Sequence, residues 1–276
     1  GKTIEFRKYD QLPKAMTPLT EGVTPTGKEM NVTKIEATVK QYGDFIELSD
    51  LLILTAIDNN IVEATTLIGS QAGRTLDTIS REVLAAGTNV QYAEGQVTSR
   101  AALTPEMKLT VKAVKKAVRF LKKQNAKKIN GYYYGIVHPD CSYDLTEDAR
   151  WIDAVKYKNP ERIYNGEIGE IEGARFVETT EAKIWAKAGA AKSTSDTTKI
   201  DVYGTLIFGA NAYATTKIEG GGLKTIIKQL GSAGTGDPLD QRATVGWKAL
   251  KVTEILTEAY MIRIETASTF SDGEAN

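Results

Sequence analysis

The residues best suited to chemistry are His138, Asp140 and Cys141, which lie within four consecutive positions. A thiol beside an imidazole is the pair that cysteine hydrolases use, and all three side chains are metal ligands. The chain, however, contains one histidine and one cysteine, so it offers neither a second base nor a Cys- or His-rich ligand set. Residues flanking Pro139 also need not point in one direction. The sequence therefore favours a packed histidine and an inert cysteine, and predicts no catalytic residue, no metal site and no cofactor.

A second stretch, GEIGEIEG at residues 166–173, has the glycine content of a nucleotide-binding loop. Its glycine spacing does not match the dinucleotide fingerprint, and its acidic side chains would crowd bound phosphates. We expect a turn between two short strands there. The protein is thus not expected to be an enzyme.

The composition excludes several classes of protein. Hydrophobic residues make up 41% and charged residues 25% of the 276 positions, which is ordinary for a globular chain. The longest apolar clusters, such as Leu51 to Ile57, are far shorter than the roughly 18 residues of a membrane span. A single cysteine permits no intrachain disulfide, which favours folding in a reducing compartment. Lys plus Arg and Asp plus Glu balance at 35 each, which argues against a surface built entirely for nucleic acid.

The charges are nevertheless unevenly distributed. Between Thr104 and Lys128 the chain has nine basic residues and one acid, and Thr104 followed by Pro105 predicts the start of a helix. Five basic side chains recur there at helical spacing: Lys108, Lys112, Lys115, Arg119 and Lys122. They form either a solvated helix face or a surface that meets nucleic acid or an acidic neighbour. From Asp140 to Glu181 eleven acids stand against five bases, which predicts electrostatic docking between two copies of the chain.

The first fifty residues contain two strand-like runs, Thr3 to Tyr9 and Lys34 to Leu48. The segment between them, Asp10 to Met30, holds three prolines and two glycines and shows no apolar period. A loop of this length is uncommon inside a domain unless it reaches something outside it, and a lone hairpin is marginally stable in water. We therefore expect an arm that is stabilised by a neighbouring copy of the chain.

The rest of the chain supplies a scaffold. Ser49 and Asp50 are suited to cap a short apolar segment, and apolar residues at helical spacing predict a helix of about 40 Å between Asp58 and Gly87. Strands are predicted over 132–137 and 199–208. Two more strands lie within 245–266, and they are expected to return to a sheet begun before residue 140, which makes the middle of the chain an inserted domain.

This order of elements resembles the major capsid protein of tailed bacteriophages, with the Hong Kong ninety-seven-like fold, and most closely the coliphage N-four-type family. The resemblance covers nearly the whole chain, and its blocks are specific in their order and spacing rather than singly. They are PLTEGVTP at 18–25, QYGDFIELSD at 41–50, AGTNVQYA at 86–93, SRAAL at 99–103, VHPD at 137–140, GEIGEIEGARFVET at 166–179, YGTLIFGANAYA at 203–214 and LGSAGTGDPLDQRATVGWKA at 230–249.

The resemblance implies an α+β fold with an extended hairpin loop (residues 1–50), a peripheral domain with the long spine helix (51–139 and 245–276) and an inserted axial domain (140–244). It implies a structural subunit that self-assembles, as hexamers and pentamers, into the icosahedral head enclosing double-stranded DNA. The intersubunit arm would include Pro18, Leu19, Glu21 and Val23, and the basic helix would face the DNA. Scaffold, portal and decoration proteins are further implied partners, with no membrane. The protein would be found in the virion, after assembly in the host cytoplasm.

Three alternatives remain open at this point. An encapsulin-like compartment shell of the same fold would enclose protein cargo, and nucleic acid inside purified shells would distinguish the two. A hydrolase would depend on His138 and Cys141. A DNA-binding module centred on the basic helix would show a steep salt dependence in the unassembled subunit.

Overall fold

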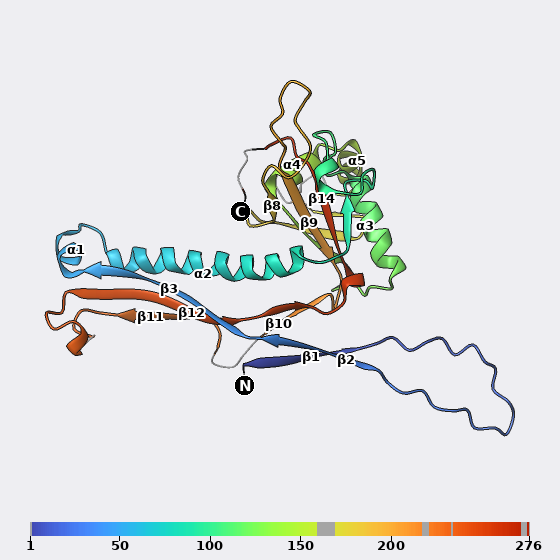
Figure 1. Ribbon diagram of the computed structural model, residues 1–276, viewed down its shortest axis with the longest axis horizontal. Coiled ribbons are helices and arrows are strands. Elements are labelled where there is room, and N and C mark those ends of the chain that lie inside the picture. The colour runs from blue at the N-terminus through green and yellow to red at the C-terminus, as the bar shows by residue number, and fades with distance from the viewer. Residues whose placement is uncertain (1, 159–168, 217–220, 233, 272–274, 276) are drawn as a thin grey trace.

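The computed structural model describes residues 2–158, 169–216, 221–232, 234–271 and 275. A long limb, formed by one helix lying along a sheet, extends from a domain built on a second sheet, and a hairpin reaches out past that domain on the other side (Figure 1). Within the described residues, no helix has both the length and the hydropathy to span a membrane.

The limb consists of the three-stranded antiparallel sheet β11-β12-β3 and the helix α2. Their bounds are Lys40–Ser49 for β3, Asn60–Ala85 for α2, Lys224–Lys228 for β11 and Arg242–Lys251 for β12. Alternate residues of β12, including Val245 and Trp247, pack against the buried face of α2 at Ala64 and Ile68. At 26 residues α2 is about 39 Å long. The predicted spine helix is confirmed, with its N-cap at Asn59 in place of Asp58.

A short helix, α1 (Asp50–Thr55), closes the far end of the limb (Figure 1). Ser49 caps it as predicted, since its hydroxyl accepts a hydrogen bond from the backbone N–H of Leu52 at 3.3 Å. Leu51, Leu54 and Ile57 are exposed, so this tip of the molecule is apolar.

The hairpin differs from the prediction in one respect. The expected strand Lys34 to Leu48 is two strands, β2 (Val32–Thr38) and β3, which meet at Val39 and belong to different sheets. Only β2 pairs with β1 (Thr3–Tyr9). A continuous alternating pattern could not reveal this change of partner, because both strands have the same period of two.

The second sheet has seven strands in the order β4-β14-β9-β5-β7-β6, with β8 paired to β9. The pairs β14–β4 and β5–β7 are parallel, and the other pairs are antiparallel. The bounds are Val90–Tyr92 for β4, Tyr133–Val137 for β5, Glu170–Ile171 for β6, Ala174–Glu178 for β7, Ile184–Trp185 for β8, Val202–Phe208 for β9 and Met261–Thr266 for β14. The described part of GEIGEIEG forms β6 and the turn that leads into β7, in agreement with the prediction, while residues 166–168 lie outside the described residues. Return of the chain to this sheet at β14 is also confirmed.

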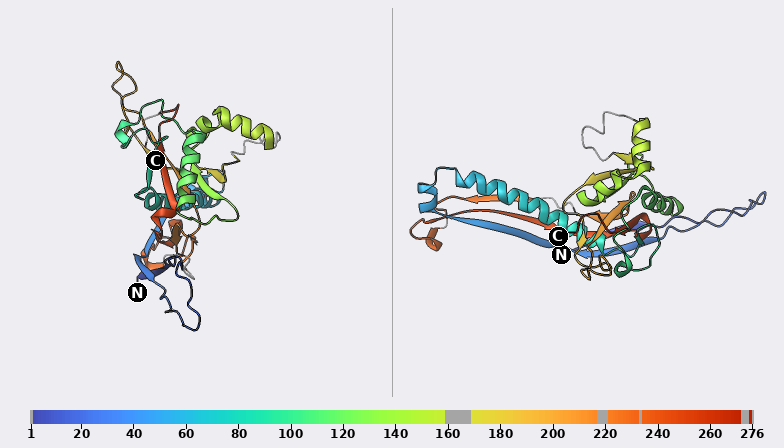
Figure 2. Two further views of the ribbon diagram at one scale, coloured as in Figure 1. Left: turned by 90° about the vertical axis from the view of Figure 1, so that its right-hand side faces the viewer. Right: turned by 90° about the horizontal axis from the view of Figure 1, so that it is seen from above.

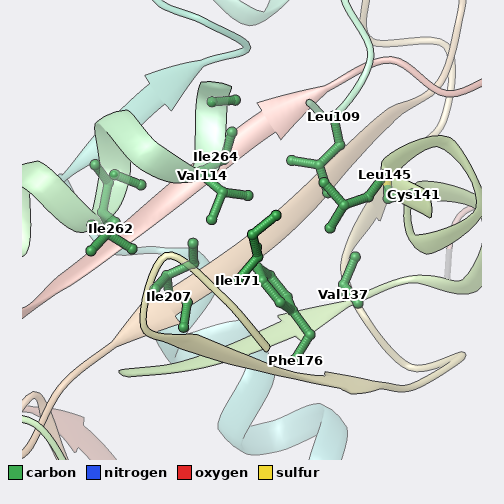
Figure 3. Packing of buried hydrophobic residues seen from close by; sticks show 14 of the residues in the cluster. Leu109, Val114, Val137, Cys141, Leu145, Ile171, Phe176, Ile207, Ile262 and Ile264 are labelled. Carbon is green, nitrogen blue, oxygen red and sulfur yellow. The ribbon is translucent and has the colours of Figure 1, made fainter. Parts of the chain in front are cut away.

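Three helices accompany this sheet: α3 (Val111–Lys123), α4 (Pro139–Thr146) and α5 (Ala149–Lys158) (Figure 2). Val114 of α3, Leu145 of α4 and Ile207 of β9 share one buried cluster with Ile264 of β14 (Figure 3). The core therefore does not divide between residues 139 and 140, where the sequence-based domain boundary falls: β5 and α3 lie before that point, and β7 and β9 after it, yet all belong to one sheet and core.

Smaller elements join the two parts of the molecule. They are the paired strands β10 (Tyr213–Thr215) and β13 (Thr253–Ile255) and the short 3-10 helices η1 (Arg100–Ala102), η2 (Gly234–Gly236) and η3 (Glu258–Tyr260).

The predicted helix start at Thr104 and Pro105 is wrong. The helix begins at Val111, where the Thr110 hydroxyl accepts a hydrogen bond from the backbone N–H of Ala113 at 3.2 Å. Residues 104–107 instead form a single turn, in which the Met107 N–H donates to Thr104 O at 3.0 Å, and Lys108 then forms a parallel bridge with Ala267. A tertiary strand contact thus overrides a local helix-start signal.

Candidate assembly surfaces

The predicted arm projects away from both sheets (Figure 1). All residues from 10 to 31 are exposed, and Leu19 and Val23 retain 78% and 63% of their surface in solvent. Few hydrogen bonds order the loop: Asp10 N–H donates to Asn31 O at 3.2 Å at its base, and Val23 N–H donates to Thr20 O at 3.2 Å. Pro18 and Glu21 are exposed beside them. Exposed apolar residues on so loosely bonded a loop leave surface for another molecule to cover.

The five predicted basic residues do not form one surface of unpaired charges. Lys112 lies 2.5 Å from Glu94 and Lys115 lies 3.2 Å from Glu172, measured between ammonium and carboxylate atoms. Hydrogen bonding from Lys112 holds the pKa of Glu94 below its ordinary value. Lys108 precedes the helix and donates to the Thr269 hydroxyl at 2.8 Å. Three of the five cations are therefore engaged within the subunit.

Arg119 and Lys122 remain exposed on α3, one turn apart, and Lys123 and Lys127 extend the same end of the helix. Among the described residues, neither Arg119 nor Lys122 has a carboxylate within 4.0 Å. Lys123 and Lys127 were not predicted as members of this group because they lie off the single stripe of helical spacing formed by Lys108, Lys112, Lys115, Arg119 and Lys122. This C-terminal end of α3 is the part of the basic segment that is open to an external anion.

The acidic segment also has partners inside the subunit. The Asp148 carboxylate accepts a hydrogen bond at 2.9 Å from the backbone N–H of Val111, the first residue of α3. Glu172 pairs with Lys115, and Asp144 lies 4.0 Å from Lys108. Several of the acids in this segment therefore bind the basic α3 segment of the same chain. Fewer of these charges are therefore free for the predicted docking between two copies of the chain, which stays a prediction.

The cluster His138, Asp140 and Cys141 does not form a catalytic site. Cys141 is fully buried in the core, where burial raises the pKa of its thiol, and its sulfur lies 3.8 Å from the Thr266 hydroxyl (Figure 3). A buried, protonated thiol is not a nucleophile. The His138 Nδ1 atom instead accepts the Asp140 backbone N–H at 3.2 Å and caps α4. Within the described residues, no group of three or more His, Cys, Asp or Glu side chains is placed to hold a metal ion.

A buried charge network in β14 was not predicted. Glu265 is fully buried and accepts hydrogen bonds from Arg100, at 2.7 and 2.8 Å, and from Arg263 at 2.8 Å. Arg263 also donates to Gly87 O at 2.8 Å, which ties the end of α2 to the sheet. The Trp185 ring lies 3.7 Å from the Arg100 guanidinium carbon. The hydrogen bonds that Arg100 donates to Glu265 raise the pKa of Arg100 above its ordinary value.

Alternation along 260–265 does indicate a strand, but a charged residue at every second position normally faces water. The signal that Arg263 and Glu265 are buried lies in Arg100, which is far away in sequence, so local pattern could not find it.

Together these features define a class of protein. The subunit is elongated and carries an exposed arm at one end and an apolar tip at the other (Figures 1 and 2). Its cluster of His138, Asp140 and Cys141 serves helix capping and core packing. Surfaces at opposite ends of one rigid body cannot cover each other, so they are suited to repeated head-to-tail contacts. This is the design of a structural subunit of a protein assembly.

Comparison with known proteins gives the particular family. Residues 59–230, more than half of the chain, match the family described as phage capsid protein. The chain belongs to this family. It is a phage capsid protein, a structural protein of the virion rather than an enzyme. The predictions of a capsid protein and of a non-enzymatic role are confirmed, and the family match favours this role over a compartment shell.

Solved structures agree on the fold. The structure is similar to the capsid of cyanophage P-SCSP1u, with a TM-score of 0.69 and 14% identity over 98% of this chain and 84% of that chain. The capsid of Ralstonia phage GP4 gives a TM-score of 0.71 and 13% identity over 99% and 86%, and that of cyanophage Pam1 gives 0.70 and 10% over 97% and 85%. The α+β fold is thus the Hong Kong ninety-seven-like capsid fold over nearly the whole chain. No protein of curated function matches the sequence.

Proposed function

We propose that copies of this chain form the hexamers and pentamers of a head that holds double-stranded DNA, with the arm of each copy lying across its neighbour. The observation that carries the proposal is the loop of residues 10–31, which is exposed throughout and presents Met16, Leu19 and Val23 to solvent. Each such contact is weak alone, but many are made at once in a closed shell, where effective concentration multiplies them.

We also propose that the chain is of the coliphage N-four type, on the order and spacing of its sequence blocks. The extended loop would comprise the β1–β2 hairpin, and the peripheral domain would comprise α2 with the β11-β12-β3 sheet. The axial domain would be the seven-stranded sheet with α3, α4 and α5. The sheet order and the shared core support these divisions over boundaries drawn at residues 139 and 244.

Negative-stain microscopy with sedimentation of the purified chain tests assembly. We expect closed shells or ring-shaped capsomers in place of a single monomer species, alone or with a co-expressed scaffold protein. Persistent monomers under both conditions would contradict the proposed assembly. Nucleic acid inside shells would support the DNA-containing head, and shells filled only with protein would favour a compartment.

The exposed end of α3 is proposed to contact the packaged DNA without sequence specificity. Replacing Arg119 and Lys122 together with glutamine is expected to weaken DNA binding by the unassembled subunit. If both residues contact phosphates, the slope of log K against log salt should become shallower by roughly 2. Fluorescence anisotropy over a series of salt concentrations measures this slope.

The matched control is the double replacement of Lys112 and Lys115 with glutamine, because both of these cations are already paired within the subunit. It removes the same charge from the same helix. Equal slopes for the two double variants would show that DNA binding follows net charge and not the exposed end of α3.

A further inference from the structure

The chain after β14 is fastened to the domain by a series of carboxylates. The Ser268 hydroxyl and the Thr269 backbone N–H donate to Asp144 at 2.8 and 3.0 Å. Two positions on, the Ser271 hydroxyl donates to Asp201 at 2.9 Å. We call residues 267–271, held in this way, the C-terminal clasp. Its bonds run to α4 and to the start of β9, so it closes over the core that these elements share.

Tyr203 joins the clasp to a further carboxylate, that of Asp140. Its hydroxyl lies 2.7 Å from Asp140 Oδ2 and 3.3 Å from the backbone oxygen of Phe270. Phe270 in turn packs edge-on against Tyr143 of α4, with ring centroids 5.3 Å apart. The position of the Tyr203 hydroxyl therefore depends on Asp140, which stands at the start of α4.

His138, the single histidine of the chain, is next to this carboxylate. Its Nδ1 atom accepts the Asp140 backbone N–H and therefore carries no proton in this arrangement, so the neutral ring holds its proton on Nε2. The same Nδ1 lies 3.4 Å from Asp140 Oδ2, and the ring lies 5.2 Å from that of Tyr203. The side chain is mostly buried, with 14% of its surface exposed.

The titratable groups that face the ring come from three elements. Asp140 and the buried Cys141 lie on α4, Glu178 lies on β7, and Tyr203 lies on β9. The Ser142 hydroxyl donates to Glu178 at 2.7 Å and lies 2.9 Å from Pro139 O. The histidine thus sits where the cap of α4 and the hydroxyl network of the clasp meet.

We propose that His138 is an acid-sensitive latch, whose protonation loosens the C-terminal clasp. A proton on Nδ1 removes the acceptor of the Asp140 N–H, so α4 loses its cap. The new N–H turns toward Asp140 Oδ2, the oxygen to which the Tyr203 hydroxyl already donates. Without its cap, α4 is held less firmly, and α4 carries Asp144 and Tyr143, which hold Ser268, Thr269 and Phe270. The clasp therefore opens more often.

The direction of the pH effect follows from the surroundings of the ring. Burial lowers the pKa of His138, while the charges of Asp140 and Glu178 oppose this shift only in part. The unfolded chain therefore binds the proton more readily than the folded one, with an ordinary value of about 6.5. Stability from the neutral ring is complete above that value and is lost as pH falls through the lower pKa of the folded state. The clasp should be closed at neutral pH and loosen in mild acid.

The test uses the full chain and its His138→Asn variant, because an asparagine oxygen accepts the cap hydrogen bond at every pH. Carboxypeptidase removes residues from the C-terminus, and mass spectrometry follows the loss of Phe270 at pH 7.5 and 5.5, with rates normalised to the urea-unfolded chain. We expect removal from the wild type to be about fivefold faster at the lower pH, the effect of losing one helix cap, and removal from the variant to be nearly independent of pH. An equal pH response in both chains would overturn the proposal.

A second measurement needs no variant. Because the chain has one histidine, its carbon-13-labelled imidazole gives a single NMR signal that can be titrated directly. A midpoint below that of the unfolded chain is expected, together with a change in the Tyr203 ring signal at the same midpoint. A midpoint at or above the unfolded value would overturn the latch, whether or not the variant folds.

Discussion

Deletion of residues 11–29 is expected to leave a folded subunit that no longer builds stable shells. The deleted residues lie in the exposed loop, so no buried side chain is lost. The remaining Asp10, Met30 and Asn31 connect β1 to β2 by a three-residue loop, a length that hairpins accept. Loss of exposed loop residues should change the midpoint of thermal unfolding by no more than about 2 °C. Sedimentation should show that the capsomer or shell fraction is largely lost.

The control for this deletion keeps the length of the arm. Replacing Met16, Leu19 and Val23 with serine should weaken assembly, while replacing Lys14 and Lys28 with serine should have little effect, if apolar contacts hold the arm to a neighbour. Unfolding of the deleted subunit would show instead that the arm belongs to its own core. Full assembly of the serine-substituted arm would assign its role to backbone contacts.

Replacement of Glu265 with glutamine is expected to cause the largest loss of stability of any single change discussed for this chain. It leaves the guanidinium groups of Arg100 and Arg263 beside a neutral amide. Position 265 is fully buried and Arg263 nearly so, while Arg100 keeps 30% of its side chain exposed. Breaking a buried ion pair costs about 3–5 kcal/mol. Urea unfolding at pH 7, followed by tryptophan fluorescence, measures the change, and Trp185 next to Arg100 reports on the site itself.

Glu47 provides a matched control, since it is exposed on β3 and carries the same charge. Its replacement with glutamine should change the free energy of unfolding by less than about 0.5 kcal/mol. A similarly small loss at Glu265 would show that the network is well solvated in solution, in contrast to its burial between η1 and β14.

The parts of the fold that sequence predicted well are those set by local composition. The arm was recognisable because proline and glycine at intervals from Pro13 to Gly27 permit neither a helix nor a strand. The long helix was recognisable because Ala64, Ile68 and Ala72 recur on one buried face. Both features are encoded in the local pattern of residue types, although the helix also packs against β12.

The parts that failed depend on partners distant in the chain. The turn at Thr104 does not continue into a helix, because the chain goes on to form the bridge between Lys108 and Ala267. Likewise, the break at Val39 exists because β2 pairs with β1 while β3 pairs with β12. A local pattern contains no information about which strand will be the neighbour.

The candidate surfaces show the same limit. Spacing placed five cations on one helix, but it could not show that Glu94 and Glu172 would approach two of them. Pairing within the subunit, and not the number of charges, determines which of them remain available to a partner.

The order of strands also has a consequence for how the chain is made. The strand β12 is the middle strand of the limb sheet, and β14 lies between β4 and β9 in the other sheet, so both sheets are completed by residues 242–266. On the ribosome, neither sheet can close until its strand within residues 242–266 has emerged, and such long-range pairing is slow. The arm is synthesised before residues 242–266, yet the body that must present it cannot form without them. A subunit whose translation stops early therefore lacks the central strands of both sheets and offers no folded body to a growing shell.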